Sequence, residues 1–436
     1  MKEFLLRLHP LQLLIYGYIF LLLLGFLLLQ APFCQTLSTG SLDNFFVATS
    51  ALSTTGLSTL DVSQAYTFWG QLVILMLIQI GGLGYMSLGS FFVLSRKRQL
   101  SVMQSDLLTY DFSLPQGFDV GHFIKSMVLF TLVIEAVGAL LLAWVFHAAG
   151  EDNVVWNGVF HSISAFCTAG FSLFSDGFVP FQNNFSLNLL ISVLAISGAL
   201  GFIVFTDFYE SITNKKAHIT YTSRIILRFT FVGILLGALV LYLSDPNIET
   251  LPPETGLMTA LFQSMSAFTT VGFNTYDIGA IVPAPMFTVI LLMVIGASPS
   301  GTGGGMKSTT FTALFAQLRG TFRGDSQARF MGRVIPPAKV GLATSNFFFY
   351  MLTLAVGTYL LLLVQEEDPY LVLFEVVSAL GTVGLSAGLT GTLTVMGKII
   401  LIILMFLGRI GPLSFGMAVF SSNTDTEDGE VEDLAI

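Results

Sequence analysis

The chain has 436 residues, of which 54% are apolar and only 10% are charged, with a formal net charge of −9 and a mean hydropathy of +0.80. These values exclude an ordinary soluble protein, in which about 45–50% of residues are apolar and about 25% are charged. We expect no nucleic-acid partner, but the net charge does not itself carry that expectation, because the positions of the charges matter more than their sum. The two cysteines, Cys34 and Cys167, have no CxxC partner and indicate buried thiols, not a metal site.

Several apolar runs are long enough to cross a hydrocarbon layer of about 30 Å, which takes about 20 residues of helix. In chain order they are 11–29, 69–94, 123–146, 187–205, 225–243, 347–364 and 395–420. Lys2 and Arg7 precede the first run, as in a signal peptide, but the run is longer than the apolar region of such peptides. We therefore predict a retained first helix in a multi-pass membrane protein.

The charged residues predict the orientation of these spans. Four connecting segments hold acidic residues and none of the eighteen lysines and arginines: 30–67, 148–184, 244–285 and 365–394. Basic residues cluster instead in three other connections: 96–98, 215–216 and 319–339. Cytoplasmic loops are enriched in Lys and Arg, so we expect these connections and both termini to face the cytoplasm. The acidic segments then face outward and attract cations, although any membrane protein can show such a charge pattern.

Each outward segment carries one copy of the same motif. Four stretches fit F-x-x-x-S-A-[FL]-x-T-x-G-[FL]-[SN] without a gap: 46–58, 160–172, 262–274 and 374–386. Each stretch is apolar but too short to span, so we expect it to re-enter the membrane. Copies of a motif at a regular spacing indicate copies of one structural unit. We interpret each unit as a spanning helix, a short pore helix, a T-x-G turn and a second spanning helix.

The repeats divide the chain into five predicted parts. These are pore repeat one (1–100), repeat two (101–214), repeat three (215–338), repeat four (339–420) and an acidic cytoplasmic tail (421–436). Irregular backbone at membrane depth is tolerated only where it is buried in protein or lines water. The predicted fold class is therefore an all-α integral membrane protein, with four fused helix–pore-helix–filter–helix units in pseudo-fourfold arrangement around one central pore.

The T-x-G turns carry the predicted chemistry. An extended stretch can point its carbonyl oxygens at a central axis and replace the hydration shell of an ion. Glycine allows the backbone angles that aim successive carbonyls the same way, and the carboxyl end of a pore helix favours a nearby cation. The predicted cation filter consists of Thr54, Thr55, Gly56, Thr168, Ala169, Gly170, Thr270, Val271, Gly272, Thr382, Val383 and Gly384.

Over residues 11–420 the motifs resemble the Trk/Ktr/HKT superfamily of potassium transporters. The resemblance implies a fold similar to four potassium-channel subunits fused in one chain. It is closest to the KtrB-type potassium uptake subunit, because no extra helices precede the first repeat. Family members with serine at the first filter glycine tend to select sodium, so Gly56 implies K⁺ as the ion bound at the filter. Whether Na⁺ acts as an activating or coupling ion stays open.

A second feature interrupts the last helix of the third repeat, which is predicted to start near Pro285. Residues 296–309 read G-A-S-P-S-G-T-G-G-G-M-K-S-T, and so many glycines with a proline cannot continue a helix. A static helix kink is one interpretation. A phosphate-binding loop is disfavoured, because Met306 stands where that motif needs glycine. The resemblance implies a gating loop formed by Gly296, Ser298, Gly301, Gly303, Gly304, Gly305 and Lys307.

Arg409, in the sequence G-R-I-G-P, stands where repeats one and two have small residues, at 81–84 and 198–201. A charge within a spanning helix is costly to bury, so we expect it to face a water-filled cavity or a partner. The resemblance implies that Arg409 restricts ion passage beside the gating loop, and a structural ion pair is the alternative. For Glu135 we expect a buried polar contact. Lys398 is ambiguous, because its long side chain can snorkel to an interface.

Three function classes remain. The first is the ion-conducting subunit of a potassium uptake system. The second is a sodium-conducting pore, or a carrier that couples K⁺ to Na⁺ or protons. The third is a polytopic membrane enzyme, which would need convergent titratable groups. The five histidines are scattered, with no H-E-x-x-H or G-x-S-x-G motif, so we predict that the chain is not an enzyme.

The resemblance also implies partners. It predicts a homodimer in the bacterial plasma membrane, surrounded by lipids and resting on a cytosolic ring of KtrA-like nucleotide-binding regulatory subunits. No dinucleotide-binding fingerprint occurs in this chain, so we expect no cofactor here and assign any nucleotide sensing to a separate protein. These partner expectations rest on family analogy alone.

Overall fold

The computed structural model describes residues 10–84, 120–213 and 219–411, together with Ser87, Ser90, Leu94, Phe415 and Gly416. Some sequence features discussed above lie outside the described residues: Lys2, Arg7, the basic clusters at 96–98 and 215–216, and the tail at 421–436. Within the described residues, regular secondary structure is helical apart from one short antiparallel hairpin. In it, β1 (Arg329–Phe330) pairs with β2 (Arg333–Val334). A mostly helical fold is thereby confirmed.

The helices follow one order four times: a long helix, a short helix, a loop and a second helix. The first two sets are α2 (Pro10–Leu29), α3 (Ser41–Leu52) and α5 (Phe68–Leu83), then α8 (Val120–Ala149), α9 (Val154–Phe166) and α10 (Phe185–Leu200). The other two are α12 (Tyr221–Ser244), α14 (Pro253–Thr269) and α15 (Pro283–Val294), then α17 (Pro337–Leu362), α18 (Pro369–Leu380) and α19 (Val395–Ile410). Additional elements are α4 (Val62–Ala65), α11 (Phe202–Thr213), α13 (Pro246–Glu249), α16 (Ser308–Arg323) and the 3-10 turns Pro32–Cys34, Val179–Phe181, Ile278–Ala280 and Thr390–Thr392.

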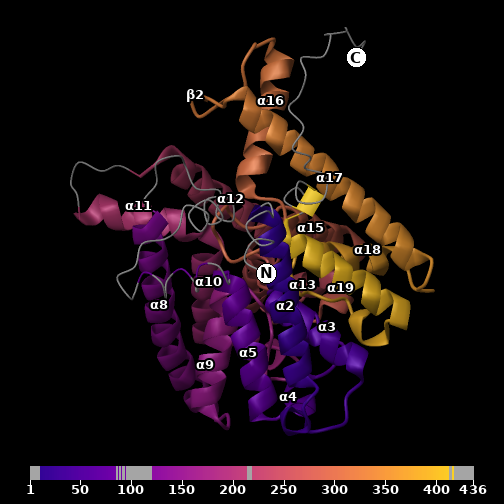
Figure 1. The fold of residues 1–436 in the computed structure, drawn as a ribbon. Coiled ribbons are helices and arrows are strands. Elements are labelled where there is room, and N and C mark those ends of the chain that lie inside the picture. Colours follow the sequence, from indigo (N-terminus) through magenta and orange to yellow (C-terminus); the bar gives the residue numbers. More distant parts are fainter. Residues whose placement is uncertain are drawn as a thin grey trace.

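The long helices form the outside of the bundle. Within the described residues, four helical stretches are long and apolar enough to cross a membrane unaided: Gln12–Leu29, Phe123–Ala149, Tyr221–Ser244 and Pro337–Leu362. They expose large apolar side chains, such as Phe20 at 65% and Leu140 at 73% exposed, and such a surface suits a hydrocarbon environment. Figure 1 shows α5, α8, α9 and α10 within one bundle, whereas α16 and the hairpin stand away from it.

The short helices α3, α9, α14 and α18 lie in the core. The motif phenylalanine of each is buried, at most 2% exposed: Phe46, Phe160, Phe262 and Phe374. The alanine of each S-A pair is also buried, and so small a side chain lets neighbouring elements approach closely. The repeated motif therefore specifies four short helices enclosed by the longer ones.

The second helix begins at a polar N-cap in three of the four sets. Thr67, Asn184 and Thr394 precede α5, α10 and α19, and the side-chain oxygen of each accepts a hydrogen bond from the backbone N–H three residues later. Such caps satisfy backbone donors that have no partner within the helix. These helices therefore start where the local sequence specifies.

The same three helices end earlier than hydropathy predicts. The spans predicted to reach 94, 205 and 420 belong to helices that end at Leu83, Leu200 and Ile410. Each is followed by a glycine with positive φ: Gly84 at 78°, Gly201 at 82° and Gly411 at 87°. Glycine adopts this conformation without a Cβ clash and so ends a helix. Between α10 and α11 the chain bends by 93°, a turn that apolar composition cannot register.

α15 and α17 each start at a proline that precedes the predicted first residue. α15 begins at Pro283 instead of near Pro285, and α17 begins at Pro337 instead of at 347. Proline at the first helical position has no N–H to leave unsatisfied and therefore suits a helix start. The first turns of α17 are partly polar and fall outside an apolar window, which is why hydropathy missed them.

Candidate functional site

The four T-x-G segments share an unusual backbone conformation. The motif threonines all have positive φ, between 48° and 59°: Thr54, Thr168, Thr270 and Thr382. The glycines two residues later also have positive φ, between 65° and 98°: Gly56, Gly170, Gly272 and Gly384. A β-branched residue in this region is a strained outlier, and such strain persists only where the surroundings enforce it, often at functional sites. The motif indicates the conformation of the glycines but not that of the threonines.

The end of each short helix holds its segment by the same hydrogen bond. The backbone N–H just before each motif glycine donates to the carbonyl oxygen of the motif serine, at 2.8–3.1 Å: Thr55 to Ser50, Ala169 to Ser164, Val271 to Ser266 and Val383 to Ser378. The serine hydroxyl makes a second hydrogen bond. In repeats one and four it accepts from the N–H of the motif glycine, and in repeats two and three it donates to the carbonyl oxygen of the residue after that glycine. The serine of the motif thus fastens every turn.

The four segments lie against one another in cyclic order. A Cβ placed on any motif glycine would lie under 3.0 Å from the carbonyl oxygen just before the glycine of the next repeat. The pairs are Gly56 with Ala169, Gly170 with Val271, Gly272 with Val383, and Gly384 with Thr55. The last pair closes a ring between repeats four and one. The structure therefore brings all the residues predicted for the filter together, with no room for a side chain at these glycines.

The glycine-rich loop between α15 and α16 lies against the threonine ends of this ring. The backbone N–H of Gly304 donates to Thr270 Oγ1 at 3.1 Å. Thr168 Oγ1 donates to Thr302 Oγ1 at 3.2 Å. A Cβ on Gly304 would overlap Thr382 Oγ1. The loop thus contacts three of the four segments, and glycine is required where it touches the fourth repeat.

The loop is also bound to the broken end of α10. Ser298 Oγ lies 2.6 Å from the carbonyl oxygen of Ala199 and 2.5 Å from that of Leu200. Thr302 Oγ1 donates to the carbonyl oxygen of Phe166, at the end of α9, at 3.0 Å. The last carbonyls of a helix have no partner within it. The loop supplies those partners, so ending α10 at Leu200 is what creates its docking site.

The remaining residues predicted for the gate pack within the loop or against α10. Lys307 Nζ donates to the carbonyl oxygen of Gly303 at 2.8 Å. Gly296 and Gly305 lie in contact, because a Cβ on either would approach the Cα of the other to 2.6–2.7 Å. A Cβ on Gly301 would lie 2.6 Å from the carbonyl oxygen of Ala199. The loop is therefore compact and closely fitted.

Arg409, in the last turn of α19, joins three repeats. Its Nη1 donates to Thr54 Oγ1 at 3.1 Å and to the carbonyl oxygen of Thr302 at 2.5 Å, and its Nη2 donates to the carbonyl oxygen of Gly81. A guanidinium carries five N–H donors in a fixed planar arrangement, which suits several acceptors at once. The half-buried charge thus lies where the ring, the loop and the end of α5 meet.

Three further predictions concern isolated polar residues. Lys398 Nζ lies 2.5 Å from Asp43 Oδ1, which makes an ion pair between α19 and α3. Glu135 is 5% exposed and accepts a hydrogen bond from Cys167 Sγ at 3.7 Å, so the predicted buried polar contact is confirmed. Cys34 and Cys167 are buried free thiols, as predicted.

The motif leaves one position unassigned that the structure shows to be polar and buried. The residue after the motif phenylalanine, written as x, is polar and fully buried in three repeats: His161, Gln263 and Glu375. Each contacts the chain that follows the motif glycine of its own repeat. The available signal was a polar residue directly after the motif phenylalanine in three of the four repeats.

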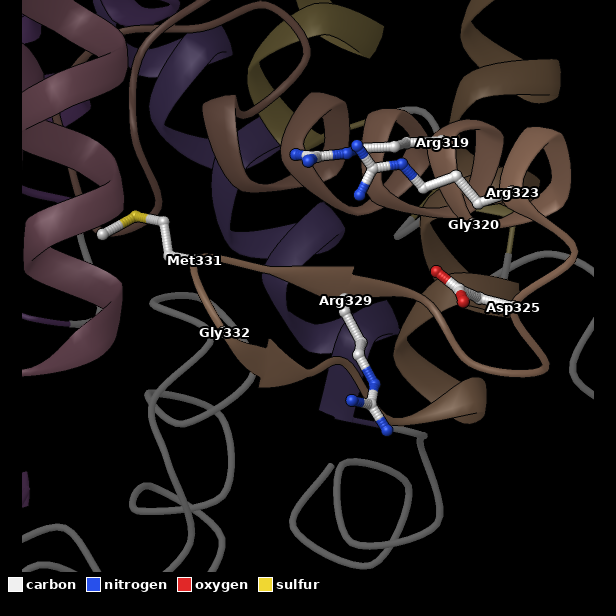
Figure 2. A pocket seen from close by; sticks show the side chains of 7 residues that line it. All are labelled: Arg319, Gly320, Arg323, Asp325, Arg329, Met331 and Gly332. Atoms are coloured by element: carbon white, nitrogen blue, oxygen red, sulfur yellow. The ribbon is translucent and has the colours of Figure 1, made fainter.

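A surface pocket of about 330 Å³ lies elsewhere, between α16 and the hairpin. Figure 2 shows Arg319 and Arg323, both from α16, on one side of it, whereas the side chain of Arg329, from β1, extends away from them. Because these guanidinium groups do not converge, the pocket holds no built anion site. Among the described residues, no three His, Cys, Asp or Glu side chains gather as metal ligands would.

Comparison with known proteins identifies relatives along nearly the whole chain. The TrkH family model, described as a cation transport protein, matches residues 25–423. The potassium/sodium uptake protein NtpJ of Enterococcus hirae is 36% identical, over 93% of this chain and 91% of that protein. The Ktr system potassium uptake protein B of Bacillus subtilis is 33% identical, over 98% of this chain and 97% of that protein. Its namesake in Vibrio alginolyticus is 34% identical, over 92% and 90%.

A solved structure shares the fold. The crystal structure of the potassium transporter TrkH from Vibrio parahaemolyticus matches with a TM-score of 0.72, over 92% of this chain and 84% of that chain. The sequence identity is 20%, so this likeness concerns the fold alone. It extends across all four sets of helices, since so large a share of the chain is covered.

Proposed function

The chain belongs to the TrkH family of cation transport proteins, as the resemblance predicted, and on that premise we propose that it is the ion-conducting subunit of a bacterial potassium uptake system. The observation that carries the proposal is the closed ring of four T-x-G segments. Relatives of 33–36% identity over nearly the whole chain are named as potassium or potassium/sodium uptake proteins. Membership of a transport family sets the membrane-enzyme alternative aside.

In this proposal the ring is the selectivity filter. Positive φ at the threonine and the glycine, with the residue between them in ordinary conformation, lets successive carbonyl groups point to one side of the strand. A ring of such oxygens can replace the water around a dehydrated K⁺. The short helices end just before each segment, and the partial negative charge at their carboxyl ends favours a cation there.

The second candidate is a sodium-conducting or cation-coupled carrier of the same architecture. The name of the relative NtpJ, a potassium/sodium uptake protein, favours keeping it. Glycine stands at all four filter positions, which the family resemblance associates with K⁺, and a serine there would push its side chain into the neighbouring carbonyl oxygen. Na⁺ as an activating or coupling ion belongs to this second candidate.

We assign the gate to residues 296–309 together with Arg409. The loop contacts the threonine end of the ring, where an ion leaving the filter would have to pass. A fixed positive charge raises the energy of a cation beside it, so Arg409 adds an electrostatic barrier. Most bonds that hold the loop join neutral groups, each worth about 1 kcal/mol. In this proposal the loop breaks these bonds when it opens the pore, whereas a static kink would leave flux independent of them.

The proposal also includes partners. Several relatives belong by name to a Ktr system, which supports a regulatory partner. The homodimer and the cytosolic nucleotide-binding ring are carried by the family resemblance alone. The positive-inside rule places the arginines of α16 and the hairpin on the cytoplasmic face, with both termini on that side of the plasma membrane. In this arrangement the chain needs no cofactor of its own.

The test is potassium uptake into cells that lack their own potassium transporters, at low external K⁺, with and without a co-expressed Ktr-type regulatory subunit. We expect saturable uptake that prefers K⁺ over Na⁺ and that falls with Gly56→Ser. Gly341→Ser is the matched control, because a Cβ there meets nothing within 4 Å. No uptake by well-expressed protein in either condition would contradict the proposal, and equal uptake of Na⁺ would favour the second candidate.

A further inference from the structure

The fourth short helix carries a fully buried acid behind its T-x-G segment. Glu375, in α18, accepts a hydrogen bond from Ser386 Oγ through Oε1 and from Thr390 Oγ1 through Oε2, the latter at 2.9 Å. Ser386 lies two residues after Gly384, so this bond ties the helix to the chain that leaves the ring. A buried carboxyl group is costly unless hydrogen bonds satisfy it. Both of its oxygens are engaged, so Glu375 braces the segment and does not itself bind an ion.

Repeats two and three place other polar groups at the same register. His161 Nδ1 lies 2.8 Å from the carbonyl oxygen of Asn157, and a carbonyl can only accept, so Nδ1 carries the proton. His161 Nε2 therefore accepts from Ser172 Oγ at 3.1 Å and from the Leu173 N–H at 3.2 Å. In repeat three, the side-chain amide of Gln263 lies 3.4 Å from Thr275 Oγ1. Each contact again involves the second or third residue after the motif glycine.

Repeat one achieves the same contact from another position. Val47 stands at the equivalent place and has no polar atom in its side chain. Asp43, one helical turn earlier and therefore on the same face of α3, instead accepts from Thr59 Oγ1 at 2.7 Å. Thr59 follows Gly56 by three residues, as Thr275 follows Gly272. All four segments are thus braced from their own short helix, by carboxyl groups in repeats one and four.

We propose that Glu375 is a positioning residue for selectivity, because it holds the outer end of the fourth segment at the spacing that favours K⁺ over Na⁺. The inference rests on the proposed function, since it takes the ring to be the filter. The segments are in van der Waals contact around the ring, so a shift of one moves the carbonyl oxygens that face the next. Selectivity depends on the number and spacing of these oxygens, whichever account of filter selectivity is adopted.

The experiment measures the preference for K⁺ over Na⁺ from competition uptake, at matched surface expression, for four single variants. Glu375→Val introduces the side chain of repeat one and leaves Ser386 without its acceptor, and Ser386→Ala removes the other partner. Glu375→Gln keeps an acceptor and imitates repeat three. Glu366→Gln is the control, because it removes an exposed negative charge from the same connecting region, residues 365–394, without touching the ring.

We expect Glu375→Val and Ser386→Ala each to lower the preference by about five- to tenfold, the change expected when a buried hydrogen bond is left unmade. The effects of combining Glu375→Val with Ser386→Ala should not add, because the two residues share one interaction. Glu375→Gln should restore most of the preference that Glu375→Val loses. Glu366→Gln should match the wild-type chain.

Two results would overturn the inference. One is that Glu375→Val keeps the K⁺ over Na⁺ preference of the wild-type chain. If Glu375→Val does not reach the membrane, the same result in Ser386→Ala would overturn the inference. The other is an equal loss in Glu366→Gln, which would assign the effect to net outer charge. A wild-type chain that shows no preference for K⁺ would overturn the proposed function as well, so that failure is distinct from a failure of Glu375 alone.

Discussion

The ring of T-x-G segments and the layer against its threonine ends differ in symmetry. Within the ring, one backbone conformation and one helix-to-turn hydrogen bond occur four times. In the adjoining layer each threonine hydroxyl meets something different. Thr54 meets Arg409, Thr168 meets Thr302, and Thr270 meets the backbone of Gly304, whereas Thr382 Oγ1 is buried and has no hydrogen-bond partner among the described residues.

This difference matches two requirements of the proposed function. A dehydrated ion needs equivalent oxygens on all sides, and four copies of one motif provide them. A gate needs a single element that can occupy two positions, and one loop with one arginine is enough. The symmetric layer should therefore respond alike to the same change in any repeat. The asymmetric layer should respond only to changes in the loop, Arg409 and their partners.

The largest expected effect comes from breaking the ring. Gly170→Ser and Gly272→Ser each place a Cβ against the neighbouring carbonyl at a backbone conformation that L-residues avoid, at a cost on the order of 1–3 kcal/mol. We expect the K⁺ over Na⁺ preference to fall tenfold or more in both variants, measured by competition uptake. A large loss in one variant and none in the other would contradict the equivalence of the segments.

A smaller effect is expected from breaking the asymmetric layer at Arg409. Arg409→Ala removes the charge and its hydrogen bonds to Thr54 and Thr302, and bonds to a charged group contribute about 1.5–3 kcal/mol each. Maximal K⁺ flux should rise several-fold while the K⁺ over Na⁺ preference changes little. Arg409→Lys keeps the charge but loses the planar arrangement of donors, so its flux should be intermediate. Reduced flux at normal expression would argue for a purely structural role.

A third prediction concerns the ion pair between repeats one and four. Lys398→Met leaves Asp43 bound only to Thr59, in a site whose two side chains are 18% and 20% exposed. We expect a loss of about 1–2 kcal/mol in stability, less than for a fully buried pair, and only a slight change in transport. A double-mutant cycle with Asp43→Asn, followed by thermal unfolding in detergent, measures the coupling. Additive losses would show that the pair contributes no stability.

The smallest effect is expected at Asp61, in the connection between the first T-x-G segment and α5. Burial by itself would raise the pKa of Asp61, but hydrogen bonds from Ser175 and Ser63 hold that pKa below its ordinary value. Its contribution to stability is therefore present above the unfolded pKa of about 4 and is lost as pH falls through the lowered folded value. Wild-type protein should melt above Asp61→Asn at pH 7, and the gap should close at low pH. If the difference in melting temperature grew as the pH fell, folding would not lower the pKa of Asp61, and this prediction would be wrong.

Local pattern predicted much of this architecture. The four motifs and the loop at 296–309 are each encoded in a short stretch of chain. The ends of α5, α10 and α19 were predicted too late, because an average over an apolar window ignores a single glycine. Gly84, Gly201 and Gly411 are nevertheless visible in the sequence, and weighting them as helix ends would have corrected all three.

The polar partners could not be predicted in this way. Lys398 pairs with Asp43 across 355 positions, and Arg409 reaches Thr54 across the same separation. Glu375 is closer to Ser386 in sequence, but its partner depends on how the chain returns after the T-x-G turn. No local periodicity encodes such pairings, because they arise only when distant helices pack.

The sequence by itself determined that this chain is a membrane protein, that one motif occurs four times, and which threonines and glycines stand at the turns. Those properties follow from composition and from steric limits that act within a few residues. Only the tertiary structure decided that the turns close into a ring, that the loop docks on the end of α10, and that Arg409 joins three repeats. These depend on backbone carbonyls left unpaired at helix ends, whose partners are chosen by the packing of segments far apart in the chain.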